Sequence, residues 1–173
     1  MNDIFIKTKA KLYFNQIEEV LVDYDFLIQH QYKIVETLHL KARLLMECGR
    51  YDEALFFLKK IEELNDVEVL KSLGEFFYLT KNHLEGISYL NKYLSMKSQD
   101  AQAWMLKASN HIELNDLEEA IKCHRKVIQI DPSWALAQGF LIHELQAFCS
   151  WTDLDKERKI LQDQMLHQNL FLL

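Results

Sequence analysis

The sequence predicts an all-α protein built as a stack of antiparallel helix pairs, and three observations predict it. Glycine and proline are rare, with four and one in 173 residues, whereas all-β folds use both residues in their many turns. The small residues Ala54, Gly86 and Ala120 recur at steps of 32 and 34 positions. Apolar residues follow each of them at helical spacing. A small side chain once per unit lets two helix axes approach closely, because a larger one would introduce strain of roughly 1–3 kcal/mol.

The clearest unit covers residues 101–134. Its first helix, its turn and its second helix carry marked residue types at fixed offsets: Trp104, Ala108, Asn115-Asp116, Ala120 and Pro132. This pattern resembles the tetratricopeptide repeat, whose period is about 34 residues. The resemblance implies a helix, a tight turn and a second, antiparallel helix in each unit, with the units stacked as a right-handed superhelix.

The same step places further units on both sides of this one. Residues 67–100 form one unit, and residues 35–66 form another that is two residues shorter. We expect the deletion in its exit loop near Leu64-Asn65. The predicted organisation is a degenerate N-terminal repeat or cap at 1–34, three repeats at 35–134, a degenerate C-terminal repeat at 135–168 and an apolar tail at 169–173. It contains about ten helices.

Capping residues mark the expected helix starts. An acceptor followed three residues later by an acid predicts a capping box at three places: Asp116 with Glu119, Asn82 with Glu85, and Thr152 with Asp155. Asp100 and Ser133 are expected to cap the first helices that follow them. The alternative is an irregular helical bundle with accidental periodicity. Matching small residues, caps and turns in three consecutive units favour repeats.

In the tetratricopeptide-repeat family, the first helices line a concave groove that holds a peptide or a partner segment. The resemblance implies such a groove here, with polar side chains of both charge signs and some methionine and aromatic surface. Its candidate residues, in order along the chain, are Glu36, His39, Arg43, Met46, Lys71, Glu75, Tyr78, Gln102, Met105, Ser109, Ile112, His143 and Gln146.

Two specialised grooves of that family are not expected. Binders of chaperone tails hold a terminal carboxylate with paired Lys, Arg and Asn side chains. The matching positions here hold Arg43, Glu75 and Ser109, beside His39, Lys71 and Met105. Recognition of an acidic chaperone tail is therefore disfavoured. The asparagine ladder of glycosyltransferases with long repeat arrays is also absent, because its positions hold Leu40, Ser72, Leu106 and Phe140.

The C-terminal unit carries a second resemblance. Residues 148–154, Phe-Cys-Ser-Trp-Thr-Asp-Leu, precede a charged helix at 155–168. They resemble the end of the repeat region in SPINDLY-like protein O-N-acetylglucosaminyltransferases, where a Cys-Asp-Trp-x-Asp segment comes before the catalytic part. Ser150 stands where that family has Asp. The resemblance implies the binding half of such an enzyme without its catalytic half. The alternative is that Trp151 only packs at the turn of its repeat, as Tyr51 is expected to do in the repeat at 35–66.

Composition argues against several classes of partner. Twenty Lys and Arg against 26 Asp and Glu give a net charge of −6, whereas a nucleic-acid interface needs clustered positive charge. The longest apolar run, residues 54–58, is far shorter than the roughly 20 residues that span a bilayer. No apolar signal segment follows Met1. We therefore expect a cytoplasmic protein that binds neither nucleic acid nor membrane.

Catalysis and the binding of metals or cofactors are not expected either. Cys123 and His124 point about 100° apart on a helix, which is a poor geometry for a nucleophile and its base. Cys48, Cys123 and Cys149 form no Cys-x-x-Cys pair, and no His-Glu-x-x-His segment exists, so no zinc site is indicated. The four scattered glycines form no phosphate loop. The cysteines are interpreted as small buried apolar residues.

The sequence thus predicts a non-catalytic scaffold or adaptor that holds a protein or peptide in the groove. Two alternatives stay open. One is the substrate-recognition part of a split or truncated O-linked N-acetylglucosaminyltransferase-like enzyme. The other is a module that forms homo-oligomers through an exposed end of the stack, with the apolar residues 170–173 as a contact.

Overall fold

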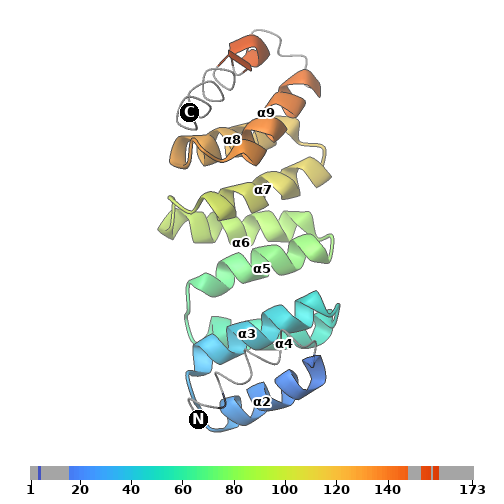
Figure 1. The fold of residues 1–173 in the computed structure, drawn as a ribbon, viewed down its shortest axis with the longest axis vertical. Helices are drawn as coiled ribbons and strands as arrows, with labels where there is room; N and C mark the ends of the chain where they lie inside the picture. The colour runs from blue at the N-terminus through green and yellow to red at the C-terminus, as the bar shows by residue number, and fades with distance from the viewer. Residues whose placement is uncertain (1–3, 5–15, 148–152, 157, 160–173) are drawn as a thin grey trace, which may run out of the picture. The chain divides into compact units, whose positions relative to one another are not determined.

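The computed structural model describes residues 4, 16–147, 153–156 and 158–159. Within these residues the chain is helical and contains no strand, so the predicted all-α class is confirmed (Figure 1). Its helices include α2 (Ile17–Gln29), α3 (Ile34–Glu47), α4 (Tyr51–Glu63), α5 (Glu68–Leu79), α6 (His83–Met96), α7 (Ala101–Glu113), α8 (Leu117–Ile130) and α9 (Ala135–Ala147). Most of residues 1–15, residues 148–152 and the tail 169–173 lie outside the described part.

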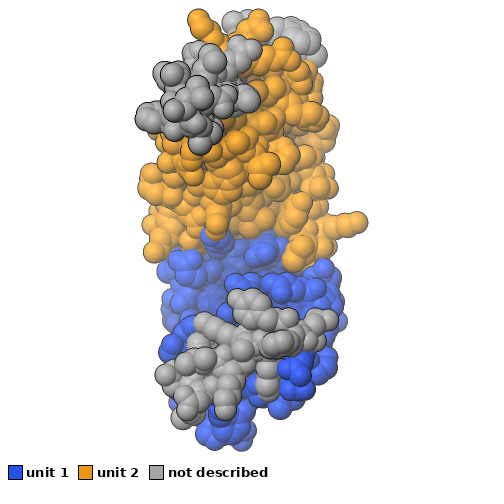
Figure 2. Space-filling model, viewed as in Figure 1, with its two compact units in different colours: residues 1–76 blue, residues 77–173 orange. Residues whose placement is uncertain are grey.

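The chain divides into two compact units, residues 1–76 and 77–173 (Figure 2). In the first unit, α2 packs on α3 and α3 packs on α4. In the second unit, contacts join α6 to α7, α7 to α8 and α8 to α9. Because α3 and α4 are joined by three residues, as are α7 and α8, each of these pairs runs antiparallel.

The turns inside the helix pairs share one geometry. Gly49, Lys81 and Asn115 have φ values of 71°, 61° and 57°, all left-handed. In each turn the next residue donates its backbone N–H five residues back, as Asp116 does to the His111 carbonyl at 2.8 Å. This is a helix C-terminal turn with a left-handed residue at its corner. Glycine suits that conformation best, and asparagine tolerates it.

The small residues lie where the repeat pattern predicts. Ala54 and Ala120 are fully buried, and Gly86 is buried. The predicted deletion in the exit loop is wrong, because the links 64–67 and 97–100 have the same length. The stretch from Ala54 to the end of α4 is one residue shorter than that from Gly86 to the end of α6, and the stretch from the start of α5 to Gly86 is one residue shorter than that from the start of α7 to Ala120. The two residues missing from this repeat are therefore lost at the end of α4 and at the start of α5.

Two of the predicted caps form and two do not. Asp116 accepts the backbone N–H of Glu119, and Asp100 accepts that of Ala103 at 3.0 Å. The prediction for Asn82 is wrong, because its amide donates to the Glu85 carboxylate and caps no backbone group. The prediction for Ser133 is also wrong, because its hydroxyl donates to Asp131 at 2.6 Å. Thr152 lies outside the described residues.

A buried charge stabilises the first unit. The Lys41 side chain is only 7% exposed and is paired with Asp25, so α3 is tied to α2. Its ammonium group also lies 4.5 Å from the centre of the Phe57 ring on α4. A buried lysine is tolerated when a carboxylate and an aromatic face compensate its charge. This pairing fixes the face of α3 that lies away from solvent.

Candidate functional site

A hollow on the first unit brings candidate groove residues together. It has a volume of about 110 Å³. Helix α3 supplies most of its lining, α5 supplies two side chains, and α4 supplies one. The lining residues are His39, Leu40, Arg43, Met46, Leu58, Ser72 and Glu75. Residues 39, 43 and 46 recur at helical spacing, so one face of α3 provides them all.

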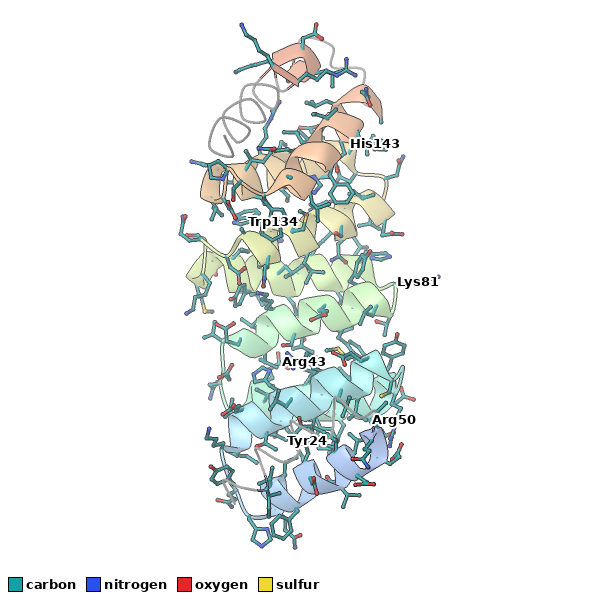
Figure 3. The ribbon with its side chains drawn as sticks, viewed as in Figure 1. Tyr24, Arg43, Arg50, Lys81, Trp134 and His143 are labelled. Carbon is teal, nitrogen blue, oxygen red and sulfur yellow. The ribbon has the colours of Figure 1, made fainter. Side chains whose placement is uncertain are left out.

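The hollow combines an apolar floor with charges of both signs. Met46 is 5% exposed and Leu58 is fully buried. Arg43 and Glu75 are exposed, one on α3 and the other on α5, and Figure 3 shows Arg43 projecting from its helix. Arg43 Nε lies 3.9 Å from a carboxylate oxygen of Glu47, and both side chains are largely exposed. Exposed pairs of this kind contribute little energy, so Arg43 is available to a guest.

His39 is held at the edge of the hollow. Its Nε2 lies 3.3 Å from Oδ1 of Asp66 in the link between α4 and α5. The same carboxylate oxygen accepts the backbone N–H of Glu68 at 2.8 Å. The imidazole therefore ties α3 to the start of α5, and its orientation is set before any guest arrives.

Four of the candidate residues line this hollow: His39, Arg43, Met46 and Glu75. Glu36 and Lys71, also in the first unit, do not. Glu36 is exposed and lies 3.3 Å from the Lys33 ammonium group. Lys71 is half-buried on α5.

The other candidate residues belong to the second unit. The Tyr78 ring makes an edge contact with His83, with centroids 5.8 Å apart. On α7, Gln102 and Ile112 are exposed, while Met105 and Ser109 are half-buried. The Ser109 hydroxyl donates to the Met105 carbonyl at 3.2 Å.

The two candidates on α9 are His143 and Gln146, and both are exposed. Figure 3 labels His143 on this helix. Together with the candidates on α7, they offer polar surface on first helices of the second unit.

Sequence reasoning missed part of the hollow. The sequence pattern identifies Leu40 and Ser72 only as positions of an asparagine ladder, and it assigns no binding role to Leu58. Leu58 lies four residues after Ala54, on the stripe of α4 that faces α3. That spacing from the small residue is the signal that identifies a second-helix floor residue.

The second unit shows why Cys123 is a poor nucleophile. It is 1% exposed, and this burial raises the pKa of its thiol to about 11. Its neighbour His124 pairs through Nδ1 with Oε2 of Glu144 at 2.8 Å. The thiol is thus protonated at neutral pH, and the imidazole is held by a carboxylate.

The described part of the chain offers neither a metal site nor a membrane-spanning helix. No group of three or more His, Cys, Asp or Glu side chains there is arranged to hold a metal ion. Among the described helices, none has both the length and the apolar character needed to cross a bilayer. Residues 148–152, which carry the core of the C-terminal resemblance, lie outside the described part.

Comparison with known proteins identifies the fold. Residues 35–68 and 101–133 match the family model of the tetratricopeptide repeat. No curated protein matches the chain's sequence. A crystal structure of MamA superimposes with a TM-score of 0.83 at 17% identity, covering 99% of this chain and 95% of that one. MamA 41-end from Desulfovibrio magneticus RS-1 gives 0.77 at 18% identity, covering 97% and 94%.

A third structure is the first tetratricopeptide-repeat domain of Spaghetti (RPAP3), bound to the HSP90 peptide SRMEEVD. It has a TM-score of 0.62 at 20% identity, covering 66% of this chain and 93% of that one. At these identities the structural likeness shows the fold, and the two matched segments show the repeat. The chain therefore has the tetratricopeptide-repeat fold, and residues 35–68 and 101–133 match the family model of that repeat.

Proposed function

We propose that the protein is a non-catalytic scaffold that binds a peptide or a segment of a partner protein in the hollow of its first unit. One observation carries the proposal: two first helices, α3 and α5, place an exposed arginine and an exposed glutamate around a buried methionine and leucine. Apolar pockets with a few charged groups at the edge are typical of peptide recognition.

The charges of the hollow define the guest. Arg43 favours a carboxylate, and Glu75 favours a cation. A terminal carboxylate needs positive charge on both sides, and Glu75 would repel it. We therefore infer an internal segment with one acidic and one basic residue on either side of an apolar side chain. The peptide in the RPAP3 structure, SRMEEVD, contains Arg-Met-Glu, in which a basic and an acidic residue flank an apolar side chain.

The non-catalytic part of the proposal rests on the thiol of Cys123 and the pairing of His124. Neither group is presented to solvent as a nucleophile or a base. Cys48 and Cys123 are both free thiols, which is compatible with the reducing cytoplasm. We place the protein there as part of the same proposal.

Selection from a phage-displayed library of random peptides tests the proposal. Peptides selected on the intact protein should bind the Arg43→Glu variant at least tenfold more weakly. Lys59→Glu is the matched control, because Lys59 is an exposed cation of the same unit whose ammonium group pairs with Glu62 and which does not line the hollow. Equal binding to all three proteins would refute the hollow as the contact, provided that circular dichroism shows each variant folded.

A transferase-related role stays a separate candidate because of the sequence resemblance at 148–154. In that role the same groove would present a protein substrate to a catalytic half on another chain. A sugar-nucleotide transfer assay with and without candidate partner chains separates the two roles. The scaffold proposal expects no transfer in either condition.

Self-association is the third candidate, and α2 favours it. Val22 and Phe26, one helical turn apart, are 66% and 40% exposed. Light scattering tests the two proposed contacts separately. A Val22→Glu/Phe26→Glu variant removes the apolar contact on α2, and a chain ending at Gln168 removes the apolar tail. A mass that stays that of one chain in the unaltered protein rules this candidate out.

A further inference from the structure

A crevice between α7 and α8 of the second unit has a volume of about 410 Å³. Helix α7 lines it with Trp104 and Lys107, and α8 lines it with Glu119, Lys122, Cys123, Arg125, Lys126 and Gln129. At 3.6 residues per turn, Trp104 and Lys107 lie on the opposite side of α7 from the candidate groove residues of that helix. The crevice is therefore a surface distinct from the groove.

The inner wall of the crevice is apolar. Cys123 is almost fully buried and its thiol is uncharged at neutral pH. The Trp104 indole donates its N–H to the Ser98 carbonyl at 2.9 Å. Since that donor is already used, the ring offers only its apolar surface to a guest. Such a wall favours an aromatic or aliphatic side chain.

The rim carries four cations, and two of them are neutralised. The Lys122 ammonium group lies 2.8 Å from Glu118 and 2.7 Å from Glu119, and these hydrogen bonds raise its pKa above the ordinary value. Arg125 Nη2 lies 3.0 Å from Asp153 Oδ2. Arg125 and Asp153 cancel in charge, and Lys122 with its two carboxylates carries one net negative charge, so these two cations add no positive charge to the rim.

Lys107 and Lys126 are the other two cations. Lys107 Nζ lies 5.2 Å from the centre of the Trp104 ring, and Lys126 Nζ donates to the neutral amide of Gln129 at 3.0 Å. Neither ammonium group has a carboxylate partner among the described residues. In a chain with a net charge of −6, an apolar wall flanked by two cations that have no carboxylate partner in the described part is complementary to an acidic guest with one apolar side chain.

We propose that this crevice is a second docking site, which binds a short acidic segment of a partner protein. The segment inserts one aromatic side chain against Trp104 and Cys123, and its carboxylates lie beside Lys107 and Lys126. A nucleic acid is a poorer guest, because the acidic chain repels a long polyanion. The site is independent of the hollow on α3 and α5, so either can fail without the other.

Titration with three synthetic peptides tests the proposal. The probe is acetyl-Glu-Asp-Phe-Asp-Glu-amide; a Phe→Ser version removes the aromatic side chain, and acetyl-Lys-Arg-Phe-Arg-Lys-amide reverses the charge. The readout is the indole N–H resonance of Trp104, assigned with Trp104→Phe. We expect saturable shifts with the acidic aromatic peptide, at least tenfold weaker binding of the other two, and weaker binding at high salt. Equal affinity for all three peptides, or no shift of Trp104, overturns the proposal.

Variants locate the contact. Lys107→Glu/Lys126→Glu should weaken binding of the acidic aromatic peptide at least tenfold, and Lys107→Gln/Lys126→Gln should weaken it less. Lys92→Glu is the matched control, because Lys92 also lies over an aromatic ring, 5.0 Å from the centre of Tyr89 on α6, but outside the crevice. If the doubly acidic variant does not fold, the glutamine variant decides. Unchanged binding in the folded variants, or an equal loss with Lys92→Glu, contradicts the site.

Discussion

His124 on α8 and Glu144 on α9 form a buried pair, with 2.8 Å between Nδ1 and Oε2. The residues are 1% and 2% exposed. Their outer atoms, His124 Nε2 and Glu144 Oε1, have no hydrogen-bond partner in the described part of the chain. The His124 ring also stacks on Phe140, with centroids 5.6 Å apart. One polar contact in an otherwise apolar interface therefore sets how α9 packs on α8.

Removing one member of this pair should destabilise the second unit. Glu144→Ala leaves His124 buried without its partner, and we expect a loss of about 2–4 kcal/mol in the free energy of unfolding. The double variant His124→Phe/Glu144→Leu keeps the stacking ring and removes both polar groups, so it should lie closer to the unaltered protein. Urea denaturation measures all three. A double variant at least as unstable as Glu144→Ala would contradict the account.

Asp100 caps α7 and also contacts the preceding helix, α6. Its Oδ1 accepts the Ala103 N–H at 3.0 Å, and its Oδ2 accepts the Tyr93 hydroxyl at 2.9 Å. Asp100→Ala should cost about 1–2 kcal/mol. Tyr93→Phe should cost about 1 kcal/mol alone and less in the Asp100→Ala background, because its acceptor is then gone. Additive costs in a thermal double-mutant cycle would show that the hydroxyl contact contributes nothing.

Ala120 tests the packing between α7 and α8. The residue is fully buried, so Ala120→Glu places an unpaired charge between two helices and should cost several kcal/mol. Ala135→Glu is the control, because Ala135 is exposed at the start of α9, where an acid is favoured by the helix dipole. Circular dichroism melting should show a large loss for the first change only. Similar melting curves for both would mean that the helix register is wrong.

Cys123 predicts a pH dependence. The folded protein keeps the thiol proton up to a pKa of about 11, whereas the unfolded chain loses it near the ordinary 9.0. The stability that burial of the neutral thiol contributes is therefore complete below pH 9 and is lost as the pH rises towards 11, by up to about 2–3 kcal/mol. The difference in unfolding free energy between the protein and Cys123→Ala should shrink over this range. A difference independent of pH would contradict the raised pKa.

The sequence was sufficient where packing is local. The small residues can be predicted because each must fit against the other helix of its pair, which is only a three-residue turn away: Ala54, Gly86 and Ala120. The turns at Gly49 and Asn115 can be predicted because glycine and asparagine accept a left-handed φ. Caps are less certain: Asp116 and Asn82 have the same pattern, but the Asn82 amide pairs with the Glu85 side chain. A side chain with both donor and acceptor groups has more than one local partner.

Long-range contacts explain what sequence reasoning missed. His124 and Glu144 are 20 positions apart in the sequence, and no periodic pattern predicts that they pair. The hollow includes Leu58 because α3 and α4 approach closely there, which depends on tertiary packing. Three of the four cations of the α7–α8 crevice lie close together at 122–126, but only the fold shows that Trp104 and Lys107 lie beside them.

The most direct test of the groove proposal is the spectrum of the protein with labelled methionine methyl groups. Met46 lies at the floor of the hollow, and Met96 on α6 is 60% exposed and lines neither site. When a peptide selected on the intact protein is added to saturation, the Met46 resonance should shift while that of Met96 stays in place, with assignments from Met→Leu variants. Selected peptides that bind but leave both Met46 and the Trp104 indole N–H unshifted, or that all shift Trp104 alone, would contradict the proposed function.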